Sequence, residues 1–460
     1  MHSPSLRKIA CAPVDAAVLV GTVFAAFAIR FWYRPDLVGD LTGLYWKAAL
    51  LVVVTEVCLY YNDLYSENVP QPTELLTKIT IALGSAMGLL SVIYYLVPSV
   101  LLARGVLLIQ FALGCVSLTL WRSFLYWAIG RDVLTRNLVI LGTGEFAVDL
   151  ARAVVASNSK GQKIVGFLGE DPALVGRSLF NPSVIGTLDD LDALRQRMRI
   201  DTVVVALGER RGRLPVESLM NCRAEGTRVE EASSFYERET GQVPVRSLRP
   251  SSFIFSRTNN NVRLVRAIKR AGDFCLALVA LVLALPLLVL AGLLIVLESG
   301  WPIFYKQERV GARGRSFVLY KLRTMRQDAE KDTGPVWAAA GQVDPRISRV
   351  GALLRKTRLD ELPQLINVLK GEMSFVGPRP ERPYFVEQLK KAIPYYDARH
   401  SVRPGITGWA QTRFTYSSSV EETEKKLQYD LYYVKNMRLS LDILILFDTA
   451  KVVLLGKGAR

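Results

Sequence analysis

Apolar residues gather in four segments of the first 130 positions, separated by short polar stretches. The segments cover residues 14–32, 45–61, 79–97 and 106–129. Each is close to the roughly 20 residues that an α-helix needs to span the hydrocarbon core of a bilayer. The pattern therefore predicts a four-helix transmembrane region in residues 1–130.

The charges that flank these segments indicate their orientation. The first segment is longer than the roughly 7–15 apolar residues of a signal peptide, and aromatic and basic residues follow it, so we expect it to remain as an anchor. The basic residues on one side of the four segments are Arg7, Lys8, Lys78, Arg131 and Arg136. The positive-inside rule then places both ends of this region in the cytoplasm, although Arg30, Arg34 and Arg104 lie on the opposite side. For Asp15 and Glu56, packing or snorkelling is favoured over an intramembrane site.

After residue 131 the pattern changes to short β-like runs that alternate with helix-like segments. The runs cover 137–141, 163–168 and 201–207, and the first leads through Gly142 and Gly144 into a helical stretch that ends near Ala156. Strand, glycine turn and helix in this order predict a Rossmann-like βαβ domain over residues 131–245. The polar, unperiodic stretch 246–262 is predicted to be a linker.

A fifth apolar segment, residues 274–297, is basic on both flanks. The flanking residues are Arg263, Arg266, Lys269 and Arg270 before it, and Lys306, Arg309, Arg313 and Arg315 after it. Both flanks therefore favour the cytoplasm. Pro286 removes a backbone hydrogen bond near the middle, so we predict a re-entrant helix that breaks at Pro286 and returns to the same leaflet. An ordinary Pro-kinked span is the competing interpretation.

The remaining residues, 263–460, are predicted to form an α-rich domain. Its last apolar segment, residues 439–455, is a little short for a span and is interrupted by Asp442, Asp448 and Lys451. These features predict a helix that lies on the membrane. The residues that are expected to point inward, into the membrane, are Leu441, Leu444, Ile445 and Val452.

Composition narrows the classes of function. Half of the 460 residues are hydrophobic, which excludes a disordered protein, and the net charge of +16 implies an anionic partner. The two histidines, His2 and His400, exclude His-rich metal sites. The five cysteines lie far apart in the chain, so no disulfide framework is predicted and a reducing compartment is expected.

The stretch 355–371 carries the strongest chemical pattern. Its Leu and Ile residues recur at helical spacing, Pro363 belongs in a first turn and Gly371 suits a C-terminal cap, so a helix is predicted to begin near Asp360. Asp360 and Glu361 could serve as a nucleophile toward phosphorus and as a ligand for a divalent cation. The alternative is that Asp360 is an N-cap and Glu361 a partner of the helix dipole.

Three basic loops favour the chemical interpretation of this carboxylate pair. They are Gly-Ala-Arg-Gly-Arg at 311–315, Lys-Leu-Arg-Thr-Met at 321–325 and Phe-Val-Gly-Pro-Arg-Pro-Glu at 375–381. Each loop alone is typical of surface charge. Together they offer glycines and arginines that suit a diphosphate, because arginine binds phosphate oxygens in pairs.

With these motifs the chain resembles the bacterial polyprenyl-phosphate hexose-1-phosphate transferases, the large monotopic phosphoglycosyl transferases that start exopolysaccharide or O-antigen units. The resemblance is strong over 263–455. It includes Lys-Arg-x-x-Asp at 269–273, the motif at 321–325, Arg-Leu-Asp-Glu-Leu-Pro-Gln at 358–364, Gly-Glu-Met-Ser-Phe-Val-Gly-Pro-Arg-Pro at 371–380 and Arg-Pro-Gly-Ile-Thr-Gly-Trp-Ala-Gln at 403–411. Leu285 precedes Pro286 where smaller members have Ser.

The resemblance implies that Asp360 attacks the β-phosphate of a UDP-sugar and releases UMP, and that undecaprenyl phosphate then accepts the phospho-sugar. It implies Mg2+ at Glu361. The implied phosphate-binding residues are Lys321, Arg323 and Arg379, and the implied substrate-binding residues are Arg313, Arg315 and Gln411. A multi-pass protein of the bacterial inner membrane is expected, with the catalytic domain facing the cytoplasm and a homodimeric assembly. The particular hexose stays open.

Two other classes of function compete. A nicotinamide-dependent enzyme that modifies nucleotide sugars is suggested by Gly142-x-Gly144-x-x-Ala147, with Glu170 or Asp171 near the place of a ribose-binding acid. The domain contains no Tyr-x-x-x-Lys pair for redox chemistry, and such turns also persist as scaffolds. A membrane-anchored nucleic-acid binder would need a continuous basic and aromatic face, whereas the basic residues cluster around the carboxylate pair and the membrane flanks.

Overall fold

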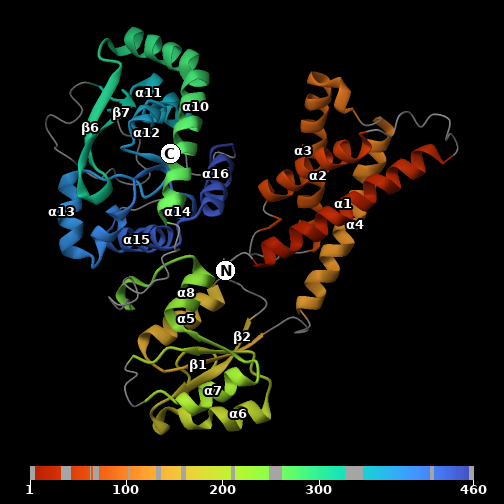
Figure 1. The fold of residues 1–460 in the computed structure, drawn as a ribbon, viewed down its shortest axis with the longest axis vertical. Helices are drawn as coiled ribbons and strands as arrows, with labels where there is room; N and C mark the ends of the chain where they lie inside the picture. Colours follow the sequence, from red (N-terminus) through yellow and green to blue (C-terminus); the bar gives the residue numbers. More distant parts are fainter. Residues whose placement is uncertain are drawn as a thin grey trace. The chain divides into compact units, whose positions relative to one another are not determined.

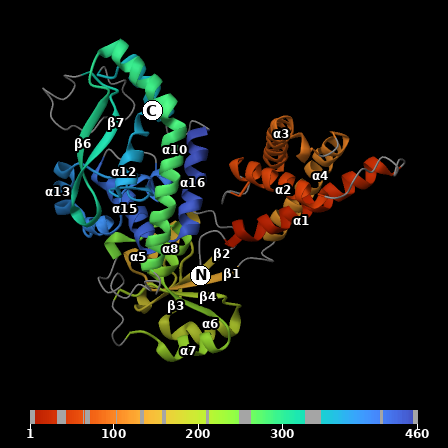
Figure 2. The ribbon, with the colours of Figure 1, turned by 45° about the horizontal axis from the view of Figure 1, so that its top comes forward.

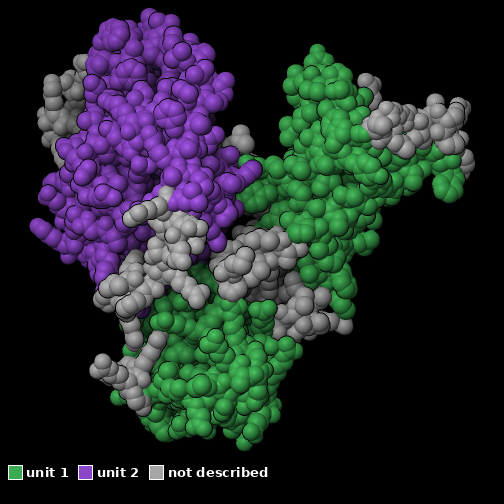
Figure 3. Space-filling view, viewed as in Figure 1, with its two compact units in different colours: residues 1–240 green, residues 241–460 purple. Residues whose placement is uncertain are grey.

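The chain forms two compact units, residues 1–240 and residues 241–460 (Figure 3). The computed structural model describes residues 6–32, 43–62, 64–65, 72–101, 104–130, 136–156, 162–208, 213–247, 262–326, 346–414 and 419–454. Most of the predicted linker, together with Arg34 and Arg131, lies outside these residues.

Four long helices form the first part of unit 1. They are α1 (Leu6–Phe31), α2 (Leu44–Tyr61), α3 (Pro72–Leu96) and α4 (Arg104–Gly130) (Figure 1). Each contributes to one apolar core, in which Leu19, Leu59, Ile79 and Leu118 are fully buried. All four are long and apolar enough to cross a membrane. The prediction of several apolar helices at these positions is confirmed.

A polar cluster lies inside this helical core. Arg122 Nη2 is 2.5 Å from Asp15 Oδ2, and both side chains are buried. The Tyr65 hydroxyl lies 2.8 Å from the same carboxylate oxygen and also contacts Glu56, while Arg122 Nη1 donates to the Leu64 carbonyl. Removing one member of a buried ion pair leaves an uncompensated charge, so this cluster fixes α1 against α4. Asp15 is thus held by Arg122 within the core and does not snorkel.

The second part of unit 1 is a parallel sheet with helices on both faces. The strands are β1 (Arg136–Leu141), β2 (Gln162–Gly169), β3 (Val184–Thr187), β4 (Thr202–Val205) and β5 (Arg228–Glu231). Their order is β3-β2-β1-β4-β5, with Leu141 opposite both Leu168 and Val205. The helices are α5 (Glu145–Ala156), α6 (Leu191–Arg197), α7 (Val216–Ala224) and α8 (Ala232–Thr240). The predicted Rossmann-like topology is confirmed.

Unit 2 begins with a short segment that the sequence assigned to the Rossmann-like domain and the linker. We call residues 241–247 the strap. Trp409 Nε1 donates to the Gly241 carbonyl at 2.9 Å, and the Val243 amide donates to the Gln428 carbonyl at 3.0 Å. Val243 and Val245 are fully buried in the core of unit 2. The strap therefore belongs to unit 2, and the division between the units falls five residues before the predicted boundary.

The fifth apolar segment is the 38-residue helix α10 (Val262–Ser299), which also meets the length and hydropathy of a membrane span. Pro286 lies inside it. The predicted helix break at Pro286 is wrong, because α10 is one continuous helix from Val262 to Ser299. Its ribbon changes direction towards its C-terminal end (Figures 1 and 2). A proline bends a helix without ending it where the flanking turns keep their own hydrogen bonds.

The first turns of α10 attach this helix to the rest of unit 2. Lys269 Nζ is 2.8 Å from Asp442 Oδ2, and Arg270 donates to the carbonyls of Val368 and Leu369 at 2.6 and 2.8 Å. Asp273 accepts the Phe375 amide. The Lys-Arg-x-x-Asp motif therefore fixes α10 to the rest of unit 2, since its charged groups bind the backbone and side chains of that unit.

The remainder of unit 2 is built from two small sheets and short helices. They are β6 (Phe304–Val310) and β7 (Ser316–Leu322), α11 (Arg349–Thr357), α12 (Gln364–Lys370), β8 (Ser374–Val376), α13 (Pro383–Ala392), β9 (Gly405–Thr407), α14 (Trp409–Arg413), α15 (Val420–Lys435) and α16 (Leu439–Leu454). β6 and β7 form an antiparallel hairpin, and β8 and β9 pair in parallel. The central core includes Tyr396, Leu431 and Tyr433.

The side of helix α16 that was predicted to face the membrane is buried in the core of unit 2. Leu441 and Ile445 are buried in the core of unit 2, and Leu444 is packed against it. Asp442 is buried as well, because Lys269 and the Tyr433 hydroxyl bind its carboxylate. Among the described side chains of this helix, the exposed large apolar residues are Leu439, Ile443 and Phe447. The side that they form differs from the predicted one.

Candidate functional site

The carboxylate pair lies in a tight turn between two helices. Helix α11 ends at Thr357 and is capped by Arg358, which has a left-handed backbone with φ 56°, and a 3-10 turn, η7 (Leu359–Glu361), follows directly. Helix α12 then starts after Pro363 and is capped by Gly371 with φ 84°. The predicted helix is confirmed, although Asp360 and Glu361 occupy the 3-10 turn that precedes it.

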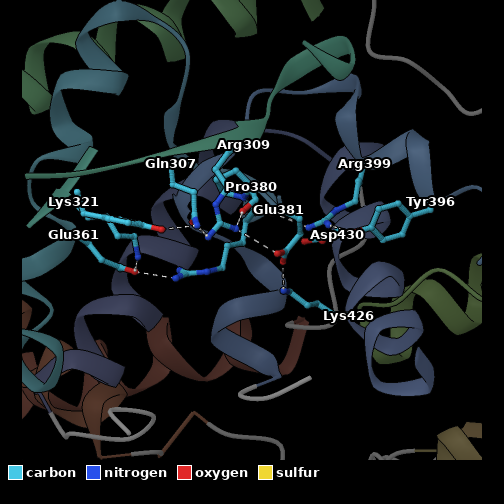
Figure 4. A network of polar contacts seen from close by, with 12 residues as sticks. Gln307, Arg309, Lys321, Glu361, Pro380, Glu381, Tyr396, Arg399, Lys426 and Asp430 are labelled. Atoms are coloured by element: carbon cyan, nitrogen blue, oxygen red, sulfur yellow. Dashed lines mark hydrogen bonds and ion pairs between the residues drawn. The ribbon is translucent and has the colours of Figure 1, made fainter. Parts of the chain in front are cut away.

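Glu361 is surrounded by cations (Figure 4). Its Oε1 lies 3.2 Å from Lys321 Nζ and 2.9 Å from Arg379 Nη2, and its Oε2 is 3.8 Å from Arg358 Nη1. Burial alone would raise the pKa of Glu361, but Arg379 and Lys321 lower it well below the ordinary value. Glu361 is therefore a permanent anion here.

Asp360 has the opposite environment. Its side chain is 8% exposed, and within the described ranges no hydrogen bond or ion pair ends on its carboxylate. Burial raises the pKa of Asp360, while Lys321 opposes this shift. A carboxylate that is desolvated and has no direct partner is a better nucleophile than one that is hydrogen-bonded and paired.

Lys321 comes from β7, where it pairs with Tyr305 of β6. Burial lowers the pKa of Lys321, and Glu361 opposes the shift. The carboxylates of Glu361 and Asp360 therefore offset part of the effect of burial on the pKa of this amine.

Arg379 comes from the loop after β8, which is fixed by a close approach of two backbones. The Gly377 amide donates to the Thr407 carbonyl at 2.9 Å. A Cβ at Gly377 would lie 2.3 Å from the Arg403 carbonyl oxygen, and one at Gly405 would lie 2.1 Å from the Gly377 nitrogen. Only glycine fits at these two positions, which explains the glycines of the motifs around Arg379 and Gly405.

A second set of charges surrounds Glu381 and was not predicted from the sequence (Figure 4). Arg309 Nη1 donates to the Pro380 carbonyl at 2.9 Å and lies 3.6 Å from Glu381 Oε2. The other carboxylate oxygen of Glu381, Oε1, lies 3.1 Å from Lys426 Nζ. Burial would raise the pKa of Glu381, but Lys426, Arg399 and Arg309 lower it to about 2. Glu381 directly follows the motif at 371–380, but its partners lie far away in the sequence, so the local pattern could not predict them.

Other predicted site residues have different partners. Arg323 Nη2 donates to the Ser299 and Gly300 carbonyls at 2.9 and 2.5 Å, and so caps the C-terminal end of α10. Arg313 and Arg315 are exposed in the turn between β6 and β7, at the opposite end of the hairpin from Lys321. Gln411 donates to the Ile406 carbonyl at 3.1 Å. The structure thus joins Lys321 and Arg379 to the carboxylate pair but not these four.

The glycine turn of the Rossmann-like domain has structural reasons of its own. A Cβ at Gly142, where φ is 121°, would lie 2.8 Å from the Ala206 carbonyl oxygen. Glu170 is paired with Arg213 at 2.6 Å, and Asp171 accepts the Ala173 amide. Both candidate ribose-binding acids are therefore engaged within the fold.

Comparison with known proteins gives the family. Residues 264–456 match the family described as bacterial sugar transferase. The UDP-glucose:undecaprenyl-phosphate glucose-1-phosphate transferase of Xanthomonas campestris pv. campestris is 32% identical over 385 residues, which cover 78% of this chain and 75% of that protein. The chain belongs to the bacterial sugar transferases.

Two further relatives define the part that is shared. The UDP-N-acetylgalactosamine-undecaprenyl-phosphate N-acetylgalactosaminephosphotransferase of Aeromonas hydrophila is 48% identical over 193 residues, 42% of this sugar transferase and 45% of that protein. The chain thus spans less than half the length of that relative. The exopolysaccharide production protein PSS of Rhizobium leguminosarum bv. phaseoli is 40% identical over 200 residues, 98% of its length.

The carboxylates of this sugar transferase fit a site in which Mg2+ is bound together with substrate phosphates. The described residues contain no group of three or more His, Cys, Asp or Glu side chains that could enclose a metal ion. Mg2+ keeps several waters and is commonly bound through one or two carboxylates together with substrate phosphates. The Asp360–Glu361 pair supplies carboxylates of this kind, and the part of the chain that the structure describes forms no cage made by the protein alone.

Proposed function

We propose that this sugar transferase moves a hexose-1-phosphate from a UDP-sugar to undecaprenyl phosphate through a covalent intermediate on Asp360, with release of UMP. The contrast between the two adjacent carboxylates carries the proposal. Glu361 is bound by Lys321 and Arg379, whereas Asp360 is buried without a direct partner among the described residues. One carboxylate is thus suited to hold charge and the other to attack.

In the first step a carboxylate oxygen of Asp360 forms a bond to the β-phosphorus of the donor. The bond from that phosphorus to the oxygen bridging it to the α-phosphorus breaks, and UMP leaves with the electron pair. Lys321 and Arg379 lie where they can stabilise negative charge on the transferring group. In the second step a phosphate oxygen of the polyprenyl acceptor attacks the same phosphorus, and the Asp360 carboxylate is released.

Mg2+ would be held by Glu361, with donor phosphate oxygens and water as the other ligands. When bound, the ion neutralises charge on the diphosphate. Its removal by a chelator should stop UMP release.

The test is UMP release from a panel of UDP-sugars, in detergent, with undecaprenyl phosphate and Mg2+. One sugar should give release and a lipid-linked phospho-sugar. Failure of every UDP-sugar to release UMP would contradict the proposal.

For topology, we propose that α1 to α4 cross the inner membrane with both ends in the cytoplasm, and that α10 enters and leaves the same leaflet. The bend in α10 and the basic residues on both flanks support a re-entrant path. Single cysteines near Lys269, at the exposed Arg266, and at the exposed Lys306 should both resist an impermeant thiol reagent in intact cells, in a background lacking the native cysteines, and both should react after permeabilisation. Labelling at Lys306 alone in intact cells would establish a full crossing.

The exposed side of α16 is proposed to rest on the leaflet. Ile443 and Phe447 are 55% and 43% exposed and are four residues apart, so they share one face of the helix. Replacing both by Ser should slow transfer to undecaprenyl phosphate several-fold, while formation of the Asp360 intermediate stays near the wild-type rate.

The matched control for that prediction replaces the buried Leu444 and Ile445 by Ser. This variant should lose thermal stability and both half-reactions together, because these residues belong to the core. An Ile443/Phe447 variant that behaves in the same way would contradict the leaflet contact. The family resemblance also supports a homodimer, which the mass of the detergent-solubilised protein would test.

A further inference from the structure

We propose that Arg399, with Asp430 as its counter-ion, is a positioning residue that fixes Arg379 for the donor diphosphate. The proposal rests on the proposed function, in which Arg379 binds that diphosphate. Arg399 lies in the 3-10 helix η8 (Tyr396–Ser401), and Asp430 lies in α15.

The loop that carries Arg379 is held through three successive backbone carbonyls. Arg399 Nη2 donates to the Arg379 carbonyl at 3.0 Å, and Arg309 Nη1 donates to the Pro380 carbonyl at 2.9 Å. The Val310 amide donates to the Glu381 carbonyl at 2.9 Å. Two of the three donors are therefore arginine side chains, which fix the path of the backbone around Arg379.

Arg399 is able to do this because both terminal nitrogens of its guanidinium have buried partners. Its Nη2 lies 2.7 Å from Asp430 Oδ2, and its Nη1 donates to the Tyr396 hydroxyl at 2.6 Å. Arg399 is 3% exposed and Asp430 is 2% exposed. A planar group with five N–H donors can bind a carboxylate, a phenol and a carbonyl at once, whereas the single ammonium of lysine has no fixed fork.

The consequence for chemistry follows from the two ends of Arg379. Its guanidinium contacts Glu361 at 2.9 Å, and its backbone is held by Arg399. A diphosphate that replaces Glu361 as its partner requires the side chain to turn while the backbone stays in place. A displacement of about 1 Å in a positioned group can cost on the order of 100-fold in rate. Loss of the Arg399 anchor should therefore weaken donor binding.

The experiment is a double-mutant cycle on the full-length protein in detergent. The variants are Arg399→Lys, Arg379→Lys and the double variant, with KM for the UDP-sugar, kcat for UMP release and the thermal midpoint measured for each. Arg399→Lys should raise KM about tenfold, and adding it to Arg379→Lys should raise KM little further, because both act through one guanidinium. If Arg399 had only a structural role, the effects of the two substitutions on KM would be independent and would multiply in the double variant.

The matched control is Arg246→Lys, which alters an exposed two-bond contact with Glu424 on the same helix as Asp430. It should leave KM unchanged and combine independently with Arg379→Lys. If Arg399→Lys does not fold, Tyr396→Phe removes one Arg399 partner and should raise KM in the same direction. This inference would be overturned if KM were unchanged in both Arg399→Lys and Tyr396→Phe, or if the effects of Arg399→Lys and Arg379→Lys on KM multiplied in the cycle. The proposed function would still stand in that case, provided that the wild-type protein releases UMP.

Discussion

Asp360→Asn is expected to abolish sugar-phosphate transfer, with a loss on the order of 10⁴-fold or more in UMP release. Asparagine has nearly the shape of aspartate, and within the described ranges no hydrogen bond to the Asp360 carboxylate would be broken. The fold should therefore persist while the nucleophile is lost. Labelled donor should modify the wild-type protein when the acceptor is omitted and should leave the Asn variant unlabelled.

A suitable control is Asp397→Asn, because Asp397 is 61% exposed and pairs with Lys390 and His400 in the same unit. This variant should retain its activity. Full turnover by Asp360→Asn would show that another group attacks the donor.

The pH dependence of the wild-type rate should also reflect the role of Asp360 as the nucleophile. Burial raises the pKa of Asp360, and only its ionised form attacks. The rate of intermediate formation should fall as pH falls through that raised pKa, so the acid limb should lie above the value of roughly 3.9 for a free aspartate. An acid limb at or below that value would contradict the role of Asp360.

The second large effect is expected for Glu361→Ala, with a loss of about 100-fold to 1,000-fold in transfer. The change removes the anion shared by Lys321 and Arg379 and, in the proposed mechanism, the protein ligand of Mg2+. Higher Mg2+ should restore part of the activity, because weaker binding is offset by concentration. A wild type that turns over fully in a chelator would remove the metal role.

Glu361→Ala should also change the alkaline limb of the profile. Burial lowers the pKa of Lys321 and Glu361 opposes that shift, so without Glu361 the lysine should lose its proton at lower pH. The activity that remains should then fall at a lower pH than in the wild type. An unchanged alkaline limb would indicate that the charge of Lys321 is not needed.

Periodicity and length were sufficient for the long apolar helices and for β1, β2 and β4. The apolar runs predicted the long helices, and the strand, glycine turn and helix around Gly142 predicted the parallel sheet. β5 was missed because its sequence, Arg-Val-Glu-Glu, is mostly polar and is recognisable only once it pairs with β4. The turn at Asp360 and Glu361 could be located because its charges and Pro363 are neighbours in the chain.

The parts that could not be predicted depend on contacts between distant positions. Asp442 was read as a polar interruption of the last helix, yet Lys269, 173 positions earlier, neutralises it and allows it to be buried. With Leu441, Ile443, Ile445 and Phe447 spread around the helix, periodicity could not choose the membrane side. Arg323 caps α10 instead of joining the carboxylate pair, because the last carbonyls of that helix need donors.

The strap sets a practical limit on how this protein can be shortened or recombined. The family match begins at residue 264, but Val243 and Val245 fill the core of unit 2, and the Trp409 indole uses the Gly241 carbonyl as its acceptor. A truncated chain or a chimaera joined at residue 264 would leave unfilled apolar space in the core of unit 2 and an indole N–H of Trp409 without its acceptor. Fragments made for crystallisation or domain exchange should therefore be cut before residue 241.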